Sequence, residues 1–98
     1  MNIVYEKMKA LVPFKTCIKE REDTDFLIVS NEDAEIIYLN ETSKEFYALC
    51  DGKRNVEQIL DELLAVYDVA RGELEQDIIG LIRDLQWNDV VHFWEVAR

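Results

Sequence analysis

Residues 39–91 constrain the fold more than any other part of the chain, because they predict three short amphipathic helices with recognisable ends. Asn40 and Asn55 precede the first and second helices, and a short amide side chain there accepts a hydrogen bond from an unpaired amide of the first turn. Asp51-Gly52 follows the first helix, and glycine adopts the left-handed conformation that ends helices at little cost. Asn88-Asp89 follows the third helix, and both residue types tolerate that conformation.

Each predicted helix carries apolar residues three or four positions apart, a spacing typical of a face that packs on a core. The three faces consist of Thr42, Phe46, Leu49 and Cys50; of Val56, Ile59, Leu60, Leu63, Leu64 and Tyr67; and of Leu74, Ile78, Leu81, Ile82 and Leu85. Gly72 precedes the third helix, which we expect to span residues 73–88. Three such faces indicate that the helices share one core.

Three runs of residues before the helices have the composition of β-strands. Phe14–Arg21 alternates partly between apolar and polar residues, while Phe26–Ser30 and Glu35–Leu39 are short and rich in strand-forming residues. Polar turns separate the three runs. Strands followed by a compact three-helix unit predict an α+β, winged-helix-like fold.

The length of 98 residues suits one domain. We expect its core to span residues 14–91, preceded by an N-terminal arm at 1–13 that forms a loose amphipathic turn or an extended segment. The C-terminal tail at 92–98 continues an alternation that begins at Val90, so it predicts a final strand or wing.

The charge of the chain disfavours nucleic acid as a partner. Twenty-one acids face eleven bases, which gives a formal net charge of −10, whereas a nucleic-acid binder needs Lys and Arg to neutralise phosphates. Residues 55–68 contain four acids and no base. A winged-helix DNA-binding regulator therefore ranks as the second hypothesis, and a general protein-interaction subunit as the third.

Residues that perform catalysis are scarce in this sequence. Cys17 and Cys50 stand apart and beside apolar neighbours, as small buried hydrophobic residues do, although a disulfide between them remains an alternative. His92 is the single histidine, too few ligands for a zinc site. We therefore expect no enzyme, no catalytic residue, no metal and no cofactor. Because no signal peptide and no membrane-spanning run is visible, we expect a cytoplasmic protein that does not bind membranes.

An ordered set of short motifs resembles the PqqD-like peptide chaperone family, also called the RiPP recognition element. The motifs are Tyr38-Leu39-Asn40-Glu41-Thr42, Leu49-Cys50-Asp51-Gly52-Lys53-Arg54, Val56-Glu57-Gln58-Ile59 with Leu63, Tyr67-Asp68-Val69, and the segment from Asp77 to Leu85. The resemblance covers residues 14–91, most of the chain. It departs from the family pattern after the third helix, where Asp89 stands in place of the usual glycine, and in the aromatic Phe93-Trp94 that follows.

The resemblance implies an N-terminal three-stranded antiparallel sheet packed on a three-helix bundle. It also implies binding of the leader segment of a ribosomally synthesised precursor peptide and its presentation to a tailoring enzyme, often a radical SAM enzyme. The leader would dock as an extra strand against Glu35–Leu39, in a groove bounded by residues 73–88. Because an open edge can also pair with its own copy, a homodimer is a further expectation.

The candidate peptide-binding residues follow from this arrangement: Glu35, Ile36, Ile37, Tyr38, Leu39, Asp77, Leu81 and Asp84. Either Ile36 and Tyr38 or Ile37 and Leu39 face the groove, because a slip of one residue exchanges the two pairs. Packing in the core is the competing interpretation for the apolar candidates. The two aspartates are either solvated surface acids or partners for a Lys or Arg of the leader.

Aromatic residues gather near the end of the chain at Trp87, Phe93 and Trp94. We expect them to form one group, which either packs against the helices or serves as a docking patch for the partner enzyme.

Overall fold

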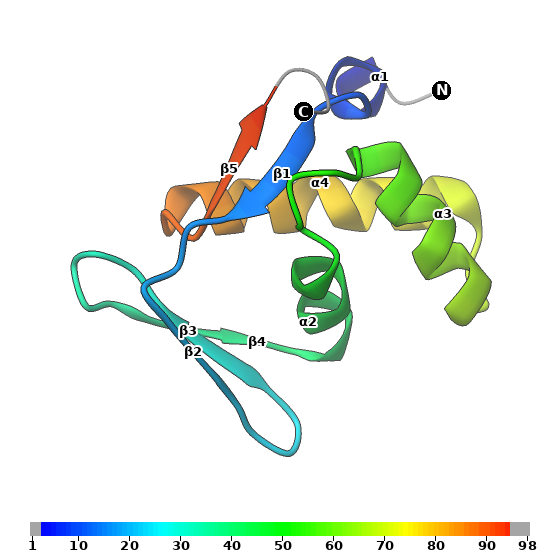
Figure 1. Ribbon diagram of the computed structural model, residues 1–98. Helices are drawn as coiled ribbons and strands as arrows, with labels where there is room; N and C mark the ends of the chain where they lie inside the picture. Colours follow the sequence, from blue (N-terminus) through cyan, green and yellow to red (C-terminus); the bar gives the residue numbers. More distant parts are fainter. Residues whose placement is uncertain (1–2, 95–98) are drawn as a thin grey trace.

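The computed structural model describes residues 3–94 and shows an α+β fold (Figure 1). Its helices are α1 (Ile3–Met8), α2 (Glu41–Ala48), α3 (Val56–Val66) and α4 (Arg71–Trp87). Its strands are β1 (Val12–Lys15), β2 (Lys19–Glu22), β3 (Leu27–Ser30), β4 (Ile36–Leu39) and β5 (Val91–Trp94). The strands β2, β3 and β4 form a three-stranded antiparallel sheet in that order, and β1 pairs with β5 in a separate antiparallel sheet. The predicted fold class and its three-stranded sheet are confirmed.

The prediction of one strand over Phe14–Arg21 was wrong, because the segment is divided between the two sheets. The Thr16 amide donates to the Val90 carbonyl (3.1 Å), beside β5, whereas the Ile18 amide donates to the Ser30 carbonyl (2.8 Å), at the end of β3. The chain therefore changes partners around Cys17. Partial alternation along one segment gives no information about which neighbour each half will meet.

The two ends of the described chain are bound to the core. Residues 3–8 form a short helix whose Tyr5 is buried, and Val12 in β1 is fully buried, so the expected loose arm is a packed element. The predicted C-terminal strand is confirmed by β5, in which Phe93 lies opposite Pro13. Residues 95–98 of the predicted tail lie outside the described residues.

The hydrophobic core lies between the helices and one face of the three-stranded sheet, with α2 next to β4 (Figure 1). Its helical members are Phe46, Tyr47, Val56, Ile59, Leu60, Leu63, Leu74, Ile78, Ile79, Ile82 and Leu85, most of them on the predicted faces, and Cys50 joins them from the loop after α2. Tyr47 was not expected there. Its buried hydroxyl donates to the Val90 carbonyl (2.9 Å), which satisfies the polar end of the side chain.

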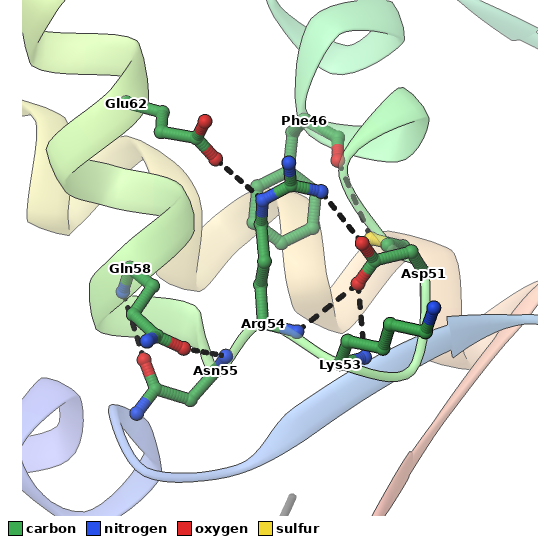
Figure 2. A network of polar contacts seen from close by, with 8 residues as sticks. Phe46, Asp51, Lys53, Arg54, Asn55, Gln58 and Glu62 are labelled. Carbon is green, nitrogen blue, oxygen red and sulfur yellow. Dashed lines mark hydrogen bonds and ion pairs between the residues drawn. The ribbon is translucent and has the colours of Figure 1, made fainter.

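Local hydrogen bonds fix the loop between α2 and α3, as Figure 2 shows. The Asp51 carboxylate accepts from the amides of Lys53 (2.9 Å) and Arg54 (3.0 Å), and the Arg54 guanidinium bridges Asp51 and Glu62. Burial raises the pKa of Asp51, but these donors outweigh that effect and hold the pKa below its ordinary value.

The predicted caps at the starts of α2 and α3 are confirmed, whereas α2 ends at Ala48, before Asp51-Gly52. Asn40 caps α2 through the Ser43 amide (3.0 Å), and Asn55 forms a reciprocal capping box with Gln58. Asp89 adopts a positive φ of 55° after α4, so the left-handed stop predicted at Asn88-Asp89 is confirmed. The start of α4 differs from the prediction, since the helix begins at Arg71 and includes Gly72.

Candidate functional site

The free edge of β4 is the first component of the candidate site. Among residues 3–94, β4 pairs with β3 and with no other strand, and β5 pairs with β1 instead of closing this edge. Such an edge presents backbone amides and carbonyls that a further extended chain can complete.

The register decides which backbone groups face the free edge. The Asn31 amide donates to the Glu35 carbonyl (3.3 Å) at the start of the β3–β4 ladder. Because hydrogen-bonded pairs alternate in an antiparallel ladder, the backbone groups of Ile37 point toward β3, as those of Leu39 do. The amides and carbonyls of Ile36 and Tyr38 therefore point away from the sheet.

The side chains of β4 divide between two faces. Leu39 is 3% exposed and belongs to the core, and Ile37 packs against the core while remaining partly exposed. Ile36 and Tyr38 are 60% and 64% exposed on the opposite face, where Tyr38 meets Phe26 edge to face with ring centroids 6.1 Å apart. Of the two predicted pairs, Ile37 and Leu39 are on the helix side.

The exposed Glu35 stands at the other end of the strand, in the turn before β4. Its carboxylate accepts from the Asn31 side-chain amide (2.9 Å), and the same amide donates to the Asn88 carbonyl (2.8 Å). This buried asparagine ties the β3–β4 turn to the C-terminal end of α4.

A hollow of about 470 Å³ lies where β4 passes into α2 and faces α4. One side of the hollow is the start of α2, with Asn40, Thr42 and Ser43. The other side is α4, with Gln76, Asp77, Ile78, Gly80, Leu81 and Asp84. The structure thus brings the candidates Asp77, Leu81 and Asp84 of α4 together around one hollow with Asn40, the residue directly after β4. The sequence interpretation missed the other lining residues, because capping already accounts for Asn40 and a glycine inside a helix gives no signal of a hollow.

The hollow contains two exposed acids, Asp77 and Asp84, both on α4. Within the part of the chain that the structure describes, no Lys, Arg or His lies within ion-pair distance of Asp77 or Asp84. By contrast, the single guanidinium of Arg71 forms ion pairs with both Asp61 (2.8 Å) and Glu75 (3.3 Å). The two aspartates are therefore available to a cation from outside.

The residues considered for catalysis have other surroundings. Cys17 and Cys50 are both free thiols, so the alternative of a disulfide is wrong. Burial raises the pKa of Cys50 to about 12, which keeps it protonated at neutral pH, and its thiol donates to the Phe46 carbonyl (3.3 Å). His92 meets Asp89 (2.7 Å). No cluster of metal-ligating side chains and no helix able to cross a membrane occurs between residues 3 and 94.

Residues 26–91 match the family model described as coenzyme PQQ synthesis protein D (PqqD). The chain belongs to the PqqD family. The match begins just before β3 and ends at the first residue of β5, so the PqqD region contains β4 together with the start of α2 and α4, which line the hollow.

Two curated relatives, both named PqqA binding protein, come from strains of Rhodopseudomonas palustris. The protein of strain TIE-1 is 37% identical over 46 residues, which cover 47% of this chain and 45% of the relative. That of strain BisB5 is 39% identical over 41 residues, which cover 42% of this chain and 40% of the relative. The aligned part is thus less than half the length of each relative. No solved structure matches the chain.

Proposed function

We propose that this PqqD-family protein binds the leader segment of a ribosomally synthesised precursor peptide and presents it to a tailoring enzyme. The observation that carries the proposal is the open edge of β4 beside a hollow in α4. The two relatives named PqqA binding protein support a peptide ligand. The peptide adds as a strand along β4, a recognised mode of peptide recognition.

Backbone hydrogen bonds provide a general attraction for the peptide. Ile36 and Tyr38 offer two amides and two carbonyls at the free edge, and each bond contributes about 0.5–1.5 kcal/mol net. This total is comparable with the cost of immobilising a flexible peptide. Side-chain contacts must therefore supply the affinity that remains.

The hollow supplies those contacts and favours a basic side chain. Leu81 is half-buried in its lining, with Asp77 one turn before it and Asp84 almost one turn after it. An aliphatic stem of Lys or Arg can lie on Leu81 while its cation pairs with a carboxylate. The net charge of −10 attracts such a segment from a distance.

Presentation follows from the way an added strand is held. Strand addition fixes a few residues of the peptide and leaves the chain on either side free to enter an enzyme. The protein then contributes binding and orientation, and the enzyme, for which a radical SAM enzyme is the leading candidate, performs the chemistry. In this role the protein is non-catalytic, needs no cofactor and works in the cytoplasm.

The direct test is an NMR titration of ¹⁵N-labelled protein with the leader of the precursor peptide encoded beside its gene. We expect the largest shifts at the amides of residues 36–39 and 76–84. A scrambled leader of equal composition serves as the control for charge alone. Shifts confined to β1 and β5, or equal shifts with the scrambled peptide, would remove the basis of the proposed site.

A further inference from the structure

Trp87, at the C-terminal end of α4, has almost no contact with the rest of the described chain. It is 89% exposed, although tryptophan has the largest side chain. The prediction that it joins Phe93 and Trp94 in one aromatic group was wrong. Trp94 instead stacks on Phe14 with ring centroids 4.6 Å apart. Packing therefore explains Trp94 but gives no reason for an indole at position 87.

Trp87 lies on a continuation of the candidate groove. A second hollow, of about 610 Å³, is lined by Arg83, Asp84, Gln86 and Trp87, and Asp84 also lines the first hollow. Gly80 and Trp87 are seven residues apart, about two helical turns, so they lie on the same side of α4. The two hollows thus meet at Asp84 and follow one side of the helix.

The β4 strand runs between the same two regions. Asn40, directly after β4, lines the first hollow. At the other end, the Asn31 side chain donates to the carbonyl of Asn88, the residue that follows Trp87 (2.8 Å). A peptide strand added along β4 therefore extends from the first hollow toward the end of α4 that carries the indole.

We propose that the peptide site continues past Asp84 and that the Trp87 indole anchors an apolar side chain of the bound leader. This inference rests on the proposed function and extends it to the chemistry of the ligand. Arg83 and Asp84 both line this hollow, and they disfavour a further cation and an anion respectively, so the side chain over Trp87 is uncharged. A buried tryptophan is among the commonest energetic anchors of an interface.

The spacing of the two ligand side chains follows from the geometry of the two elements. Seven helical residues rise about 10 Å, and an extended chain covers that length in about three residues. Because groove-facing side chains of a strand alternate, the apolar residue lies two or four positions from the basic residue that Asp77 and Asp84 attract. The leader motif is therefore a basic and an apolar residue at an even spacing.

Two single-tryptophan variants test the proposal, since the chain has only Trp87 and Trp94. In Trp94→Phe, Trp87 is the sole tryptophan, and its emission should shift to shorter wavelength when the leader peptide is added. In Trp87→Phe, the remaining indole already stacks on Phe14, and its emission should stay unchanged. The unfolding midpoint of each variant is measured in parallel.

The energetic test is Trp87→Ala, which should weaken leader binding at least about tenfold, as loss of an interface anchor does. Its unfolding midpoint should stay close to that of the wild type, because the side chain is 89% exposed. Alanine substitutions along the leader then identify the partner residue. That position should lose its effect on affinity in the Trp87→Ala background, which is the signature of a coupled pair.

The outcomes separate this inference from the function on which it rests. Wild-type binding with no change in Trp87 emission and no loss in Trp87→Ala would overturn the inference alone. Failure of the wild type to bind the leader would overturn both. Emission of Trp94→Phe that depends on protein concentration without peptide would assign the indole to a contact between two copies, and would also overturn the inference.

Discussion

The two edges of the three-stranded sheet differ in a way that shows how a small domain can keep one edge open. The β2 edge reads Lys-Glu-Arg-Glu, and all four residues are exposed. Two of its acids are held by lysines, Glu20 by Lys15 (3.5 Å) and Glu22 by Lys44 (2.8 Å). Charges of this kind discourage another strand from pairing.

The β4 edge reads Ile-Ile-Tyr-Leu and carries no charge within the strand. Its four residues give a short edge, which limits pairing with other copies while leaving backbone groups for a ligand. The hollow between α4 and the start of α2 lies next to the end of β4 and not next to β2. The comparison supports the proposal that β2 is the protected edge and β4 the peptide-binding edge, and four predictions test it.

The largest effect is expected for Tyr38→Pro, which removes an amide from the free edge without touching the ladder to β3. We expect leader binding to weaken about 10- to 100-fold, because one bond is lost and a peptide carbonyl is left without its donor. Isothermal titration calorimetry measures the affinity, and thermal unfolding checks that the fold is retained.

The matched control is Glu20→Pro on the opposite edge. The Asp23 amide donates to the Phe26 carbonyl (2.8 Å), and alternation from this pair places the Glu20 amide on the outer side of β2. Its replacement should change leader affinity less than about twofold, within the range of a surface change remote from the site. Equal losses in the two variants would remove the distinction between the edges.

The next effect is expected for the double variant Asp77→Asn and Asp84→Asn, which neutralises the acids of the hollow. Binding of a basic leader should weaken about three- to tenfold at low salt, since an exposed ion pair contributes about 0.2–1 kcal/mol. The dependence of affinity on salt should also become shallower. Glu73→Gln, on the same helix but outside the hollow, is the control and should retain most of the affinity and its salt dependence.

A smaller effect is expected for Gly80→Ala in the wall of the hollow. A Cβ at Gly80 would meet no atom of the chain within 4 Å, and the same holds at Gly72. Both alanine variants should therefore stabilise α4, by about 0.5–1 kcal/mol in an unfolding measurement. Only Gly80→Ala should weaken leader binding, about threefold, because its methyl group enters the space that the ligand occupies. Unchanged binding would show that the ligand does not approach this turn of α4.

The smallest effect concerns the protected edge. The hydrogen bond from Lys44, assisted by its charge, lowers the pKa of Glu22 below its ordinary value of 4.5. The pair therefore stabilises the fold fully above about pH 4.5, and this contribution disappears as the pH falls through the lower folded-state pKa. Carboxyl NMR titration should show the depressed pKa, and Lys44→Ala should return it toward the ordinary value. An unshifted Glu22 in the wild type would mean that the pair does not persist in solution.

Local chemistry explains which features could be predicted from the sequence. The caps at Asn40 and Asn55, and the stop at Asp89, depend on residues within three or four positions. The neighbouring sequence therefore contains all the information needed to predict them. The helical core was predicted for the same reason, since Leu74, Ile78 and Leu85 share one face of a single helix. The candidate strand Ile36–Leu39 was also visible from its own composition.

Long-range contacts explain what could not be predicted. The division of residues 14–21 between two sheets depends on Val90 and Ser30, which are distant in the sequence. The same is true of Trp87 and Trp94, which look alike in the sequence but differ in what lies beside them. Which side of β4 faces the helices was decided by the packing of Leu39 in the core, and which backbone groups face its free edge by the register with β3.

The amino-acid sequence by itself determined the caps at Asn40 and Asn55, the stop at Asp89, which strand is apolar, and the acidic net charge, because each of these depends on neighbouring residues or on composition. The tertiary structure alone decided that β5 joins β1 and leaves β4 open. It also decided that Asp77 and Asp84 face the start of α2 across a hollow. A site between separate elements exists only after packing has brought them together, so its shape is a property of the fold.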